Sequence, residues 1–184
     1  MNNKTEILFL GRLFSKANEN KIRSKCLLDM QDAANVLQWN IIDGFVENDV
    51  SKVDVVSYLP VDSWPKYYKD CVIKEETHTI SENIIFHQCG FCNITKIKQL
   101  LNNKVCNKFV LEWLKKTNSN RKIVVCYSCN NVLMKAVAAA KKKDKSVITV
   151  QVIADITEFA ANAGSHFLRD LYTKMQIKKN EQLQ

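Results

Sequence analysis

Two carboxylates follow a β-branched run near the end of the chain. The run Ser146–Ile153 is rich in Val, Ile and Thr, and Asp155 and Glu158 come directly after it. Such a run is typical of a strand that is buried on both faces. Open α/β sheets bind their ligands in the crevice outside the carboxyl ends of the strands. We therefore expect both carboxylates at a ligand crevice; the alternative is that they only cap the next segment.

Two C-x-x-C pairs, Cys89–Cys92 and Cys126–Cys129, contain the thiols of a possible four-thiolate zinc site. The strand order derived below places the strands beside these pairs three positions apart, which is about 14 Å at the usual interstrand spacing. Zinc needs every sulfur at about 2.3 Å. We expect no metal site and interpret the cysteines as small buried hydrophobes. The alternative for Cys126 and Cys129 is a redox pair at a strand-to-helix turn.

Aromatic and basic side chains alternate in the segment after the second predicted strand, around Trp64, Lys66 and Tyr67. Aromatic rings with nearby positive charge suit stacking on a sugar or on single-stranded nucleic acid. We predict that these three residues bind substrate. The alternative is that the rings only fix the loop to the sheet.

The segment from Ser165 onward has the pattern of a basic amphipathic helix. Its apolar residues share one side, and bases flank them: Phe167, Leu168, Leu171, Tyr172 and Met175, with Arg169, Lys174, Lys178 and Lys179. This pattern is typical of a helix on an anionic membrane surface. The alternative is an ordinary core-facing helix.

Composition limits the class of protein. The 184 residues correspond to one domain, and 46% hydrophobic residues indicate a folded chain. The net charge of +8 favours an anionic partner, such as nucleic acid, a membrane face or a phosphorylated ligand. No apolar run is long enough to span a membrane, and the N-terminus lacks a signal peptide. With seven cysteines, an odd number, we expect a reducing, cytoplasmic location.

Hydrophobic periodicity predicts strands that alternate with helices. The expected strands are Ile7–Leu10, Val53–Ser57, Asn83–His87, Ile123–Tyr127 and Ser146–Ile153, and the expected helices are Leu27–Glu47, Ile94–Lys116 with a break near Asn102, and Asn131–Lys142. We interpret Arg12–Lys25 and Leu59–Thr79 as loops. The alternation predicts an α/β, Rossmann-like parallel sheet with helices on both faces and the strand order 3-2-1-4-5.

This topology gathers the ends of the first, fourth and fifth strands at one crevice. Gly11, Ser128 and Asn130 should lie there beside the two carboxylates, and we predict that they bind substrate. Only one glycine follows the first strand where a dinucleotide fingerprint needs three, and no phosphate-binding P-loop is present. We therefore expect no nucleotide cofactor.

Several tracts together resemble the acceptor-side domain of family 4 glycosyltransferases of capsular and exopolysaccharide synthesis. The resemblance covers about Ile7 to Phe159 and rests on the tracts Ile7–Phe14, Gln31–Asn35, Leu37–Ile42, Leu59–Val61, Trp64–Lys69, Gly90–Ile94, Ile97–Gln99, Tyr127–Ser128 and Asp155–Phe159. In the last tract the family tends to show Asp-Leu-Pro-Glu-Tyr, from which this chain departs at Thr157 and Phe159.

The resemblance implies a GT-B enzyme, in which one Rossmann-like domain holds the acceptor and a second holds the nucleotide-sugar. This sequence matches only the first, so we expect a donor-binding domain to be absent from it and the chain to be inactive alone. The resemblance also implies that Asp155 is a polar catalytic residue facing the cleft, with Glu158 as a second candidate. The acceptor would be lipid-linked or a saccharide, at the inner face of the plasma membrane.

Two other functions remain open on the sequence. One is a binding module without turnover, which serves as partner to a separate donor-domain subunit. The other is a nucleic-acid-binding Rossmann domain, which charge alone suggests and which we do not expect. The sugar, the acceptor and the stereochemistry are not determined by the sequence.

Overall fold

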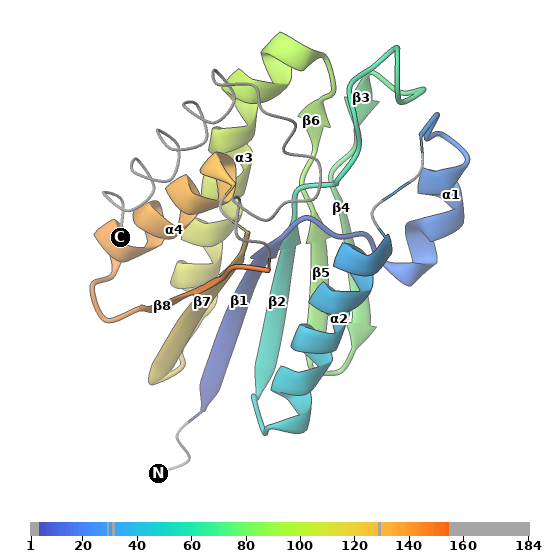
Figure 1. Cartoon of the computed structure of the whole chain (residues 1–184). Helices are drawn as coiled ribbons and strands as arrows, with labels where there is room; N and C mark the ends of the chain where they lie inside the picture. The colour runs from blue at the N-terminus through green and yellow to red at the C-terminus, as the bar shows by residue number, and fades with distance from the viewer. Residues whose placement is uncertain (1–3, 29, 31, 129, 155–184) are drawn as a thin grey trace.

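A computed structural model describes residues 4–28, 30, 32–128 and 130–154. Six strands form a central sheet in the order β4-β5-β2-β1-β7-β8 (Figure 1). Their bounds are β1 Thr5–Gly11, β2 Lys52–Ser57, β4 Glu76–Ser81, β5 Ile84–Gln88, β7 Arg121–Tyr127 and β8 Ile148–Val152. The short strands β3 (Val72–Ile73) and β6 (Phe91–Cys92) form a separate antiparallel pair.

The predicted parallel sheet and its strand order are confirmed. The five predicted strands correspond to β1, β2, β5, β7 and β8, and neighbouring members of this set pair in parallel. The parallel pairs β1–β2 and β7–β8 are each joined by a connection that carries a helix on a face of the sheet, which is the crossover that consecutive parallel strands require. The fold is therefore a Rossmann-like α/β sheet.

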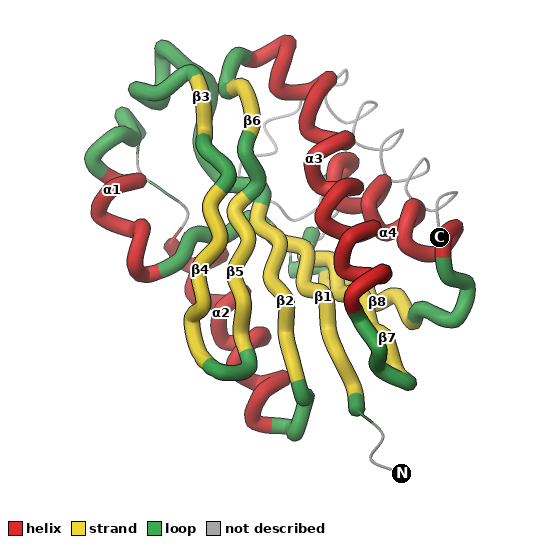
Figure 2. The backbone as a smooth tube through the Cα atoms, turned by 180° about the vertical axis from the view of Figure 1, so that it is seen from behind, coloured by secondary structure: helices red, strands yellow, loops and turns green. Residues whose placement is uncertain are grey.

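Helices cover both faces of this sheet. On one face lies α2 (Asp32–Glu47), and on the other lie α3 (Thr95–Lys116) and α4 (Asn131–Lys143), which Figure 2 shows from behind. Alternate residues of β1 serve the two layers: Leu8 and Leu10 pack toward α3 and α4, and Ile7 and Phe9 pack toward α2. This alternation is expected for a central strand, because successive side chains point to opposite faces.

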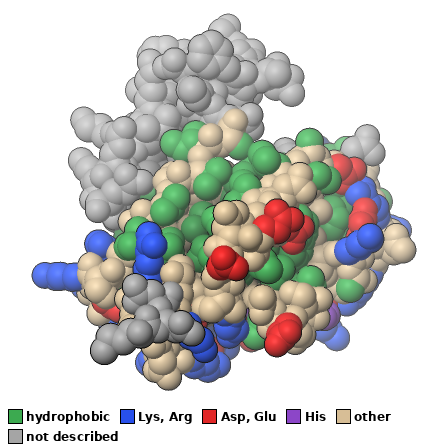
Figure 3. All heavy atoms as spheres, turned by 90° about the horizontal axis from the view of Figure 1, so that it is seen from below, with side chains coloured by type: hydrophobic (Ala, Val, Ile, Leu, Met, Phe, Trp, Pro, Cys, Tyr) green, Lys and Arg blue, Asp and Glu red, His purple; other side chains and the backbone are tan. Residues whose placement is uncertain are grey.

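The prediction that the Ser146–Ile153 strand is buried on both faces is wrong. β8 is an edge strand, and Ile148 and Val150 are each 42% exposed. They lie opposite Ile123 and Val125 of β7, on the face where α2 packs. On that face Val125 and Tyr127 of β7 are buried in the same cluster as Ile42 of α2, so the exposure is confined to β8. Hydrophobic side chains occupy a broad part of the surface seen from below (Figure 3).

Both segments interpreted as loops contain secondary structure. The segment after β1 includes a 3-10 turn, Lys16–Asn18, and α1 (Glu19–Arg23), in which Ile22 alone is buried. The segment after β2 includes β3 and the start of β4. β4 pairs antiparallel with β5 and is the strand at that end of the sheet. Five of the six β4 residues are polar, so the strand lacks the apolar alternation that would have predicted it.

Two predicted helices differ in detail. α2 begins at Asp32 rather than Leu27, and its buried residues are Gln38 and Ile42, whereas the apolar Leu37 is 43% exposed. α3 runs without a break through Asn102. None of the helices in the described ranges is sufficiently long and apolar to cross a membrane.

One carboxylate is buried between the sheet and α3. Asp54 of β2 accepts hydrogen bonds from Trp113 Nε1 at 3.1 Å and pairs with Lys52 Nζ at 3.1 Å and His87 Nε2 at 3.4 Å. Burial raises the pKa of Asp54, but the hydrogen bonds and charges of His87 and Lys52 outweigh burial, and the net pKa is lowered. The folded chain therefore holds Asp54 ionised.

Candidate functional site at the carboxyl ends of the strands

The carboxyl ends of the parallel strands meet at one edge of the sheet. Gly11 at the end of β1 lies opposite Ser57 at the end of β2, and Leu10 lies opposite Cys126 of β7. From β1 the chain adds β2 on one side, and β7 lies on the other side, so the order in which the strands are added along the sheet reverses between β1 and β7, although the two strands are parallel. In open α/β sheets this reversal marks the usual ligand site.

Gly11 makes room for a buried amide. A Cβ at this position would lie 2.5 Å from Gln38 Oε1, 2.8 Å from the Phe9 ring and 2.9 Å from Leu13 Cδ2. Gln38 accepts a hydrogen bond from Arg12 N at 2.9 Å and donates to the carbonyl oxygens of Arg12 and Ala34, each at 3.0 Å. The glycine therefore permits the contact that fixes the backbone of Arg12.

The segment after Arg12 is held by side chains from two other elements. Ser57 Oγ bonds both the N–H and the carbonyl of Leu13, and Asn35 Oδ1 accepts from Phe14 N at 2.9 Å. Trp39 Nε1 donates to the Phe14 carbonyl at 2.9 Å. Backbone groups that would otherwise be unsatisfied are thus paired, and the turn after β1 has a defined conformation.

The Arg12 side chain is half-buried and incompletely paired. Its Nε is buried and has no hydrogen-bond partner among the described residues. Burial lowers the pKa of Arg12, while the nearby Tyr58 and Asp62 raise it to a smaller extent. Because guanidinium groups stay ionised in proteins, the result is a desolvated positive charge with an unused donor.

A second cation lies beside Arg12. Lys98 Nζ of α3 donates to the Val61 carbonyl at 2.6 Å and to Asn93 Oδ1 at 3.1 Å, and it lies 5.7 Å from the centre of the Tyr58 ring. Burial, followed by the positive charge of Arg12, lowers the pKa of Lys98 to about 8, although Asp62 acts in the opposite direction. The exposed carboxylate of Asp62 is thus the acid that acts on both cations. A bound anion would reduce the repulsion between Arg12 and Lys98.

The Trp64 loop borders this pair of cations. Asn93, which accepts from Lys98, donates through Nδ2 to the Asp62 carbonyl at 2.8 Å, and Trp64 N donates to the Asn93 carbonyl at 3.0 Å. The Trp64 side chain is 39% exposed and is not part of the hydrophobic core. Lys66 Nζ lies 4.9 Å from the centre of the Tyr67 ring. The loop thus carries an exposed Trp64 whose backbone bonds Asn93, the residue that also accepts from Lys98.

Ser128 and Asn130 lie in the turn between β7 and α4. Ser128 has a left-handed backbone with φ of 68°, and its carbonyl accepts from Gln151 Nε2 at 2.9 Å. Asn130 Oδ1 accepts from Val132 N at 2.9 Å and caps α4. Asn130 therefore has a structural role, and the strained Ser128 stands one residue past Tyr127, at the same edge of the sheet as Gly11.

Some predicted site residues fall outside the described part of the chain. Asp155 and Glu158 lie there, as does the predicted helix from Ser165, so their roles stay predictions. The structure brings Gly11 and Ser128 to the ends of neighbouring strands and links Trp64 to Lys98 through hydrogen bonds with Asn93. The cations Arg12 and Lys98 and the carboxylate Asp62 were not predicted as site residues; a basic residue directly after the glycine of the first strand was the available signal.

The strand order separates the two C-x-x-C pairs. Cys89 follows β5 and Cys126 lies in β7, with β2 and β1 between these strands, which confirms the premise of the argument against zinc. Cys89 and Cys126 are buried, and Cys89 Sγ lies 3.7 Å from Cys106 Sγ. The hydrogen bond with Cys106, together with burial, raises the pKa of Cys89, so its thiol stays protonated at neutral pH.

No protein-family model, curated protein or solved structure gives a significant match to this chain. The function must therefore be argued from the geometry of the site.

Proposed function

We propose that this chain is the acceptor-binding half of a GT-B glycosyltransferase that elongates a lipid-phosphate-linked acceptor. The observation that carries the proposal is the pair of half-buried cations Arg12 and Lys98 at the carboxyl edge of a Rossmann-like sheet. A phosphate group is the ligand that suits them, because it is anionic and its oxygens accept several charge-assisted hydrogen bonds.

The neighbouring residues agree with such a ligand. The exposed Trp64, whose backbone bonds the Asn93 that Lys98 contacts, offers an apolar surface on which a sugar or a prenyl chain could pack. The net charge of +8 favours contact with an anionic membrane leaflet. Asp155 is the proposed catalytic residue, as the family resemblance implies, and a nucleotide-sugar would be held by a separate donor-binding domain. The experiments below address the binding of the acceptor, which does not require the donor-binding domain.

Replacement of Arg12 by Gln or of Lys98 by Met should each weaken the binding of polyprenyl phosphate in neutral detergent micelles about tenfold, since each removes one charge-assisted donor. Binding is measured by fluorescence titration at physiological ionic strength. The control Lys142→Gln removes an exposed charge of α4 and should leave the affinity unchanged. Equal binding of polyprenyl phosphate and polyprenol would contradict the proposal.

The affinity for polyprenyl phosphate should also depend on pH. The lowered pKa of Lys98, about 8, means that the free protein loses this positive charge as pH rises through 8. The phosphate has its second pKa near 6 and is fully ionised across this range, so it does not cause the change. Affinity should fall between pH 7 and pH 9. In Lys98→Arg, whose side chain stays charged, the fall should disappear; a fall of the same size in that variant would exclude Lys98 as its source.

A further inference from the structure

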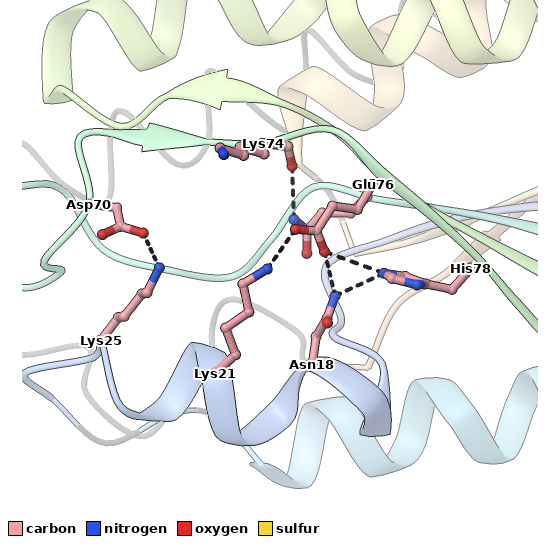
Figure 4. A network of polar contacts seen from close by, with 8 residues as sticks. Asn18, Lys21, Lys25, Asp70, Lys74, Glu76 and His78 are labelled. Carbon is pink, nitrogen blue, oxygen red and sulfur yellow. Dashed lines mark hydrogen bonds and ion pairs between the residues drawn. The ribbon is translucent and has the colours of Figure 1, made fainter.

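A small pocket lies beside α1, separate from the Arg12–Lys98 pair. It has a volume of about 160 Å³ and is formed between α1, the segment from Tyr68 to Glu76 and the carboxyl end of β5. Its apolar wall includes Ile22, Leu59 and Ile73, and its polar wall includes Gln88 and the lysines and carboxylates shown in Figure 4. Like the cation pair, it belongs to the carboxyl edge of the sheet.

Gln88 contributes an acceptor that lacks a donor. The residue is 5% exposed, its Nε2 donates to the Lys74 carbonyl at 3.0 Å, and its buried Oε1 has no partner among the described residues. The carbonyl of Lys74 fixes the orientation of the amide, because only the nitrogen can donate to it. A buried acceptor without a donor is unfavourable, so a ligand that donates a hydrogen bond here is favoured.

Two of the three lysines that line the pocket are paired with carboxylates, and the third, Lys74, is an exposed residue. Lys21 Nζ pairs with Glu76 at 2.6 Å and Lys25 Nζ pairs with Asp70 at 2.5 Å. Glu76 also accepts from Asn18 Nδ2 at 2.9 Å (Figure 4). A simple anion would meet two carboxylates and a simple cation would meet the lysines, so neither is favoured. A hydroxyl group both donates and accepts, and it can bond either member of each pair.

We propose that this pocket binds a single neutral sugar ring, with Gln88 Oε1 accepting a hydrogen bond from one of its hydroxyl groups. The apolar wall suits the C–H face of the ring. The volume of about 160 Å³ equals that of roughly five water molecules and lies below the 300–1,000 Å³ of sites for larger ligands. The pocket therefore suits one ring rather than an oligosaccharide. The assignment names the sugar subsite of the acceptor and so rests on the proposed function.

The test is an NMR titration of the whole chain with methyl glycosides of glucose, galactose and N-acetylglucosamine, without any lipid phosphate. One glycoside should shift the Gln88 side-chain amide and the backbone amides of Ile22 and Val72 saturably. The variant Gln88→Met, of similar size, should weaken binding at least tenfold. Val72 lies at the exposed rim of the pocket, so Val72→Trp should block the pocket without changing Gln88 or its hydrogen bond. This variant tests the proposal if Gln88→Met does not fold.

The matched control is Ile80→Trp, which adds the same side chain to an exposed position of β4 that does not line the pocket and should bind normally. Absence of saturable shifts at tens of millimolar glycoside, or unchanged binding in Val72→Trp, overturns the sugar pocket. If that happens while Arg12 still governs polyprenyl phosphate binding, only the pocket assignment fails. If glycosides bind at the pocket and polyprenyl phosphate does not bind at Arg12, the proposed function fails and the sugar pocket stands.

Discussion

Replacement of Gly11 by Ala should lower the free energy of unfolding by about 2–4 kcal/mol, the combined cost of overpacking a filled site and of disturbing buried hydrogen bonds. The new Cβ would lie within 3.0 Å of Gln38, Phe9 and Leu13 at once. Gln38 cannot move away without losing its bonds to Arg12 and Ala34. Urea unfolding measures the loss. Polyprenyl phosphate binding should weaken as well, because Gln38 positions the backbone of Arg12.

Gly44→Ala is the matched control for this change. Gly44 lies in α2, and nothing lies within 4 Å of the Cβ that the substitution would add. Alanine in a helix interior is favoured over glycine by about 1 kcal/mol, so this variant should be more stable than the natural chain. If Gly11→Ala were as stable as Gly44→Ala, the prediction that Gly11 is too closely packed to accept a Cβ atom would be wrong.

Asp54→Asn should destabilise the chain by about 2–4 kcal/mol, somewhat below the usual cost of breaking a buried ion pair because Lys52 is partly exposed. Asparagine keeps the size of the side chain but offers one acceptor oxygen and an NH₂ group. Trp113 Nε1 and Lys52 Nζ both contact the same carboxylate oxygen, so the one oxygen of asparagine would be used there and the NH₂ group would face His87 Nε2. The negative charge opposite Lys52 would be lost. The measurement is again the free energy of unfolding in urea, at pH 7.

The stabilisation from Asp54 should be lost in acid. Its pKa is lower in the folded chain than the ordinary value of 3.8, so the unfolded chain binds the proton first as pH falls. The contribution is therefore complete above about pH 5 and decreases below pH 4. Asp54→Asn should lose less stability than the natural chain between pH 5 and pH 3. Asp43→Asn, at an exposed position of α2, should match the natural chain at both ends of this range.

The order of the sheet was predictable from the sequence because it depends on features that are local or general. Apolar runs such as Ile123–Tyr127 identify the strands, and the handedness of the crossovers restricts their order. The burial of each strand was harder to predict from the sequence. The run at β8 has the composition of a doubly buried strand, yet Val150 is 42% exposed, because composition identifies a strand but not the layers that cover it. β4 was missed for the opposite reason, since it is mostly exposed and polar.

The candidate site was predicted by position and not by chemistry. The topology argument located the carboxyl edge and Gly11 correctly within the fold. It could not identify Arg12 and Lys98, because the burial that lowers their pKa values arises from segments far apart in the sequence. Gln38 shows the same limit. A polar residue on a helix is ordinarily assigned to the solvent side, and here the core admits it because backbone groups of Arg12 and Ala34 pair with its amide.

The central place of β1 has a consequence for folding during synthesis. β1 occupies Thr5–Gly11, and one of its two neighbours, β7, is not translated until Arg121–Tyr127. β2 and β5 can pair on the other side much earlier, but one edge of this buried central strand stays open until most of the chain has left the ribosome. We therefore expect nascent chains that stop short of residue 121 to be prone to aggregation and to bind chaperones, whereas the complete β7 should end that exposure.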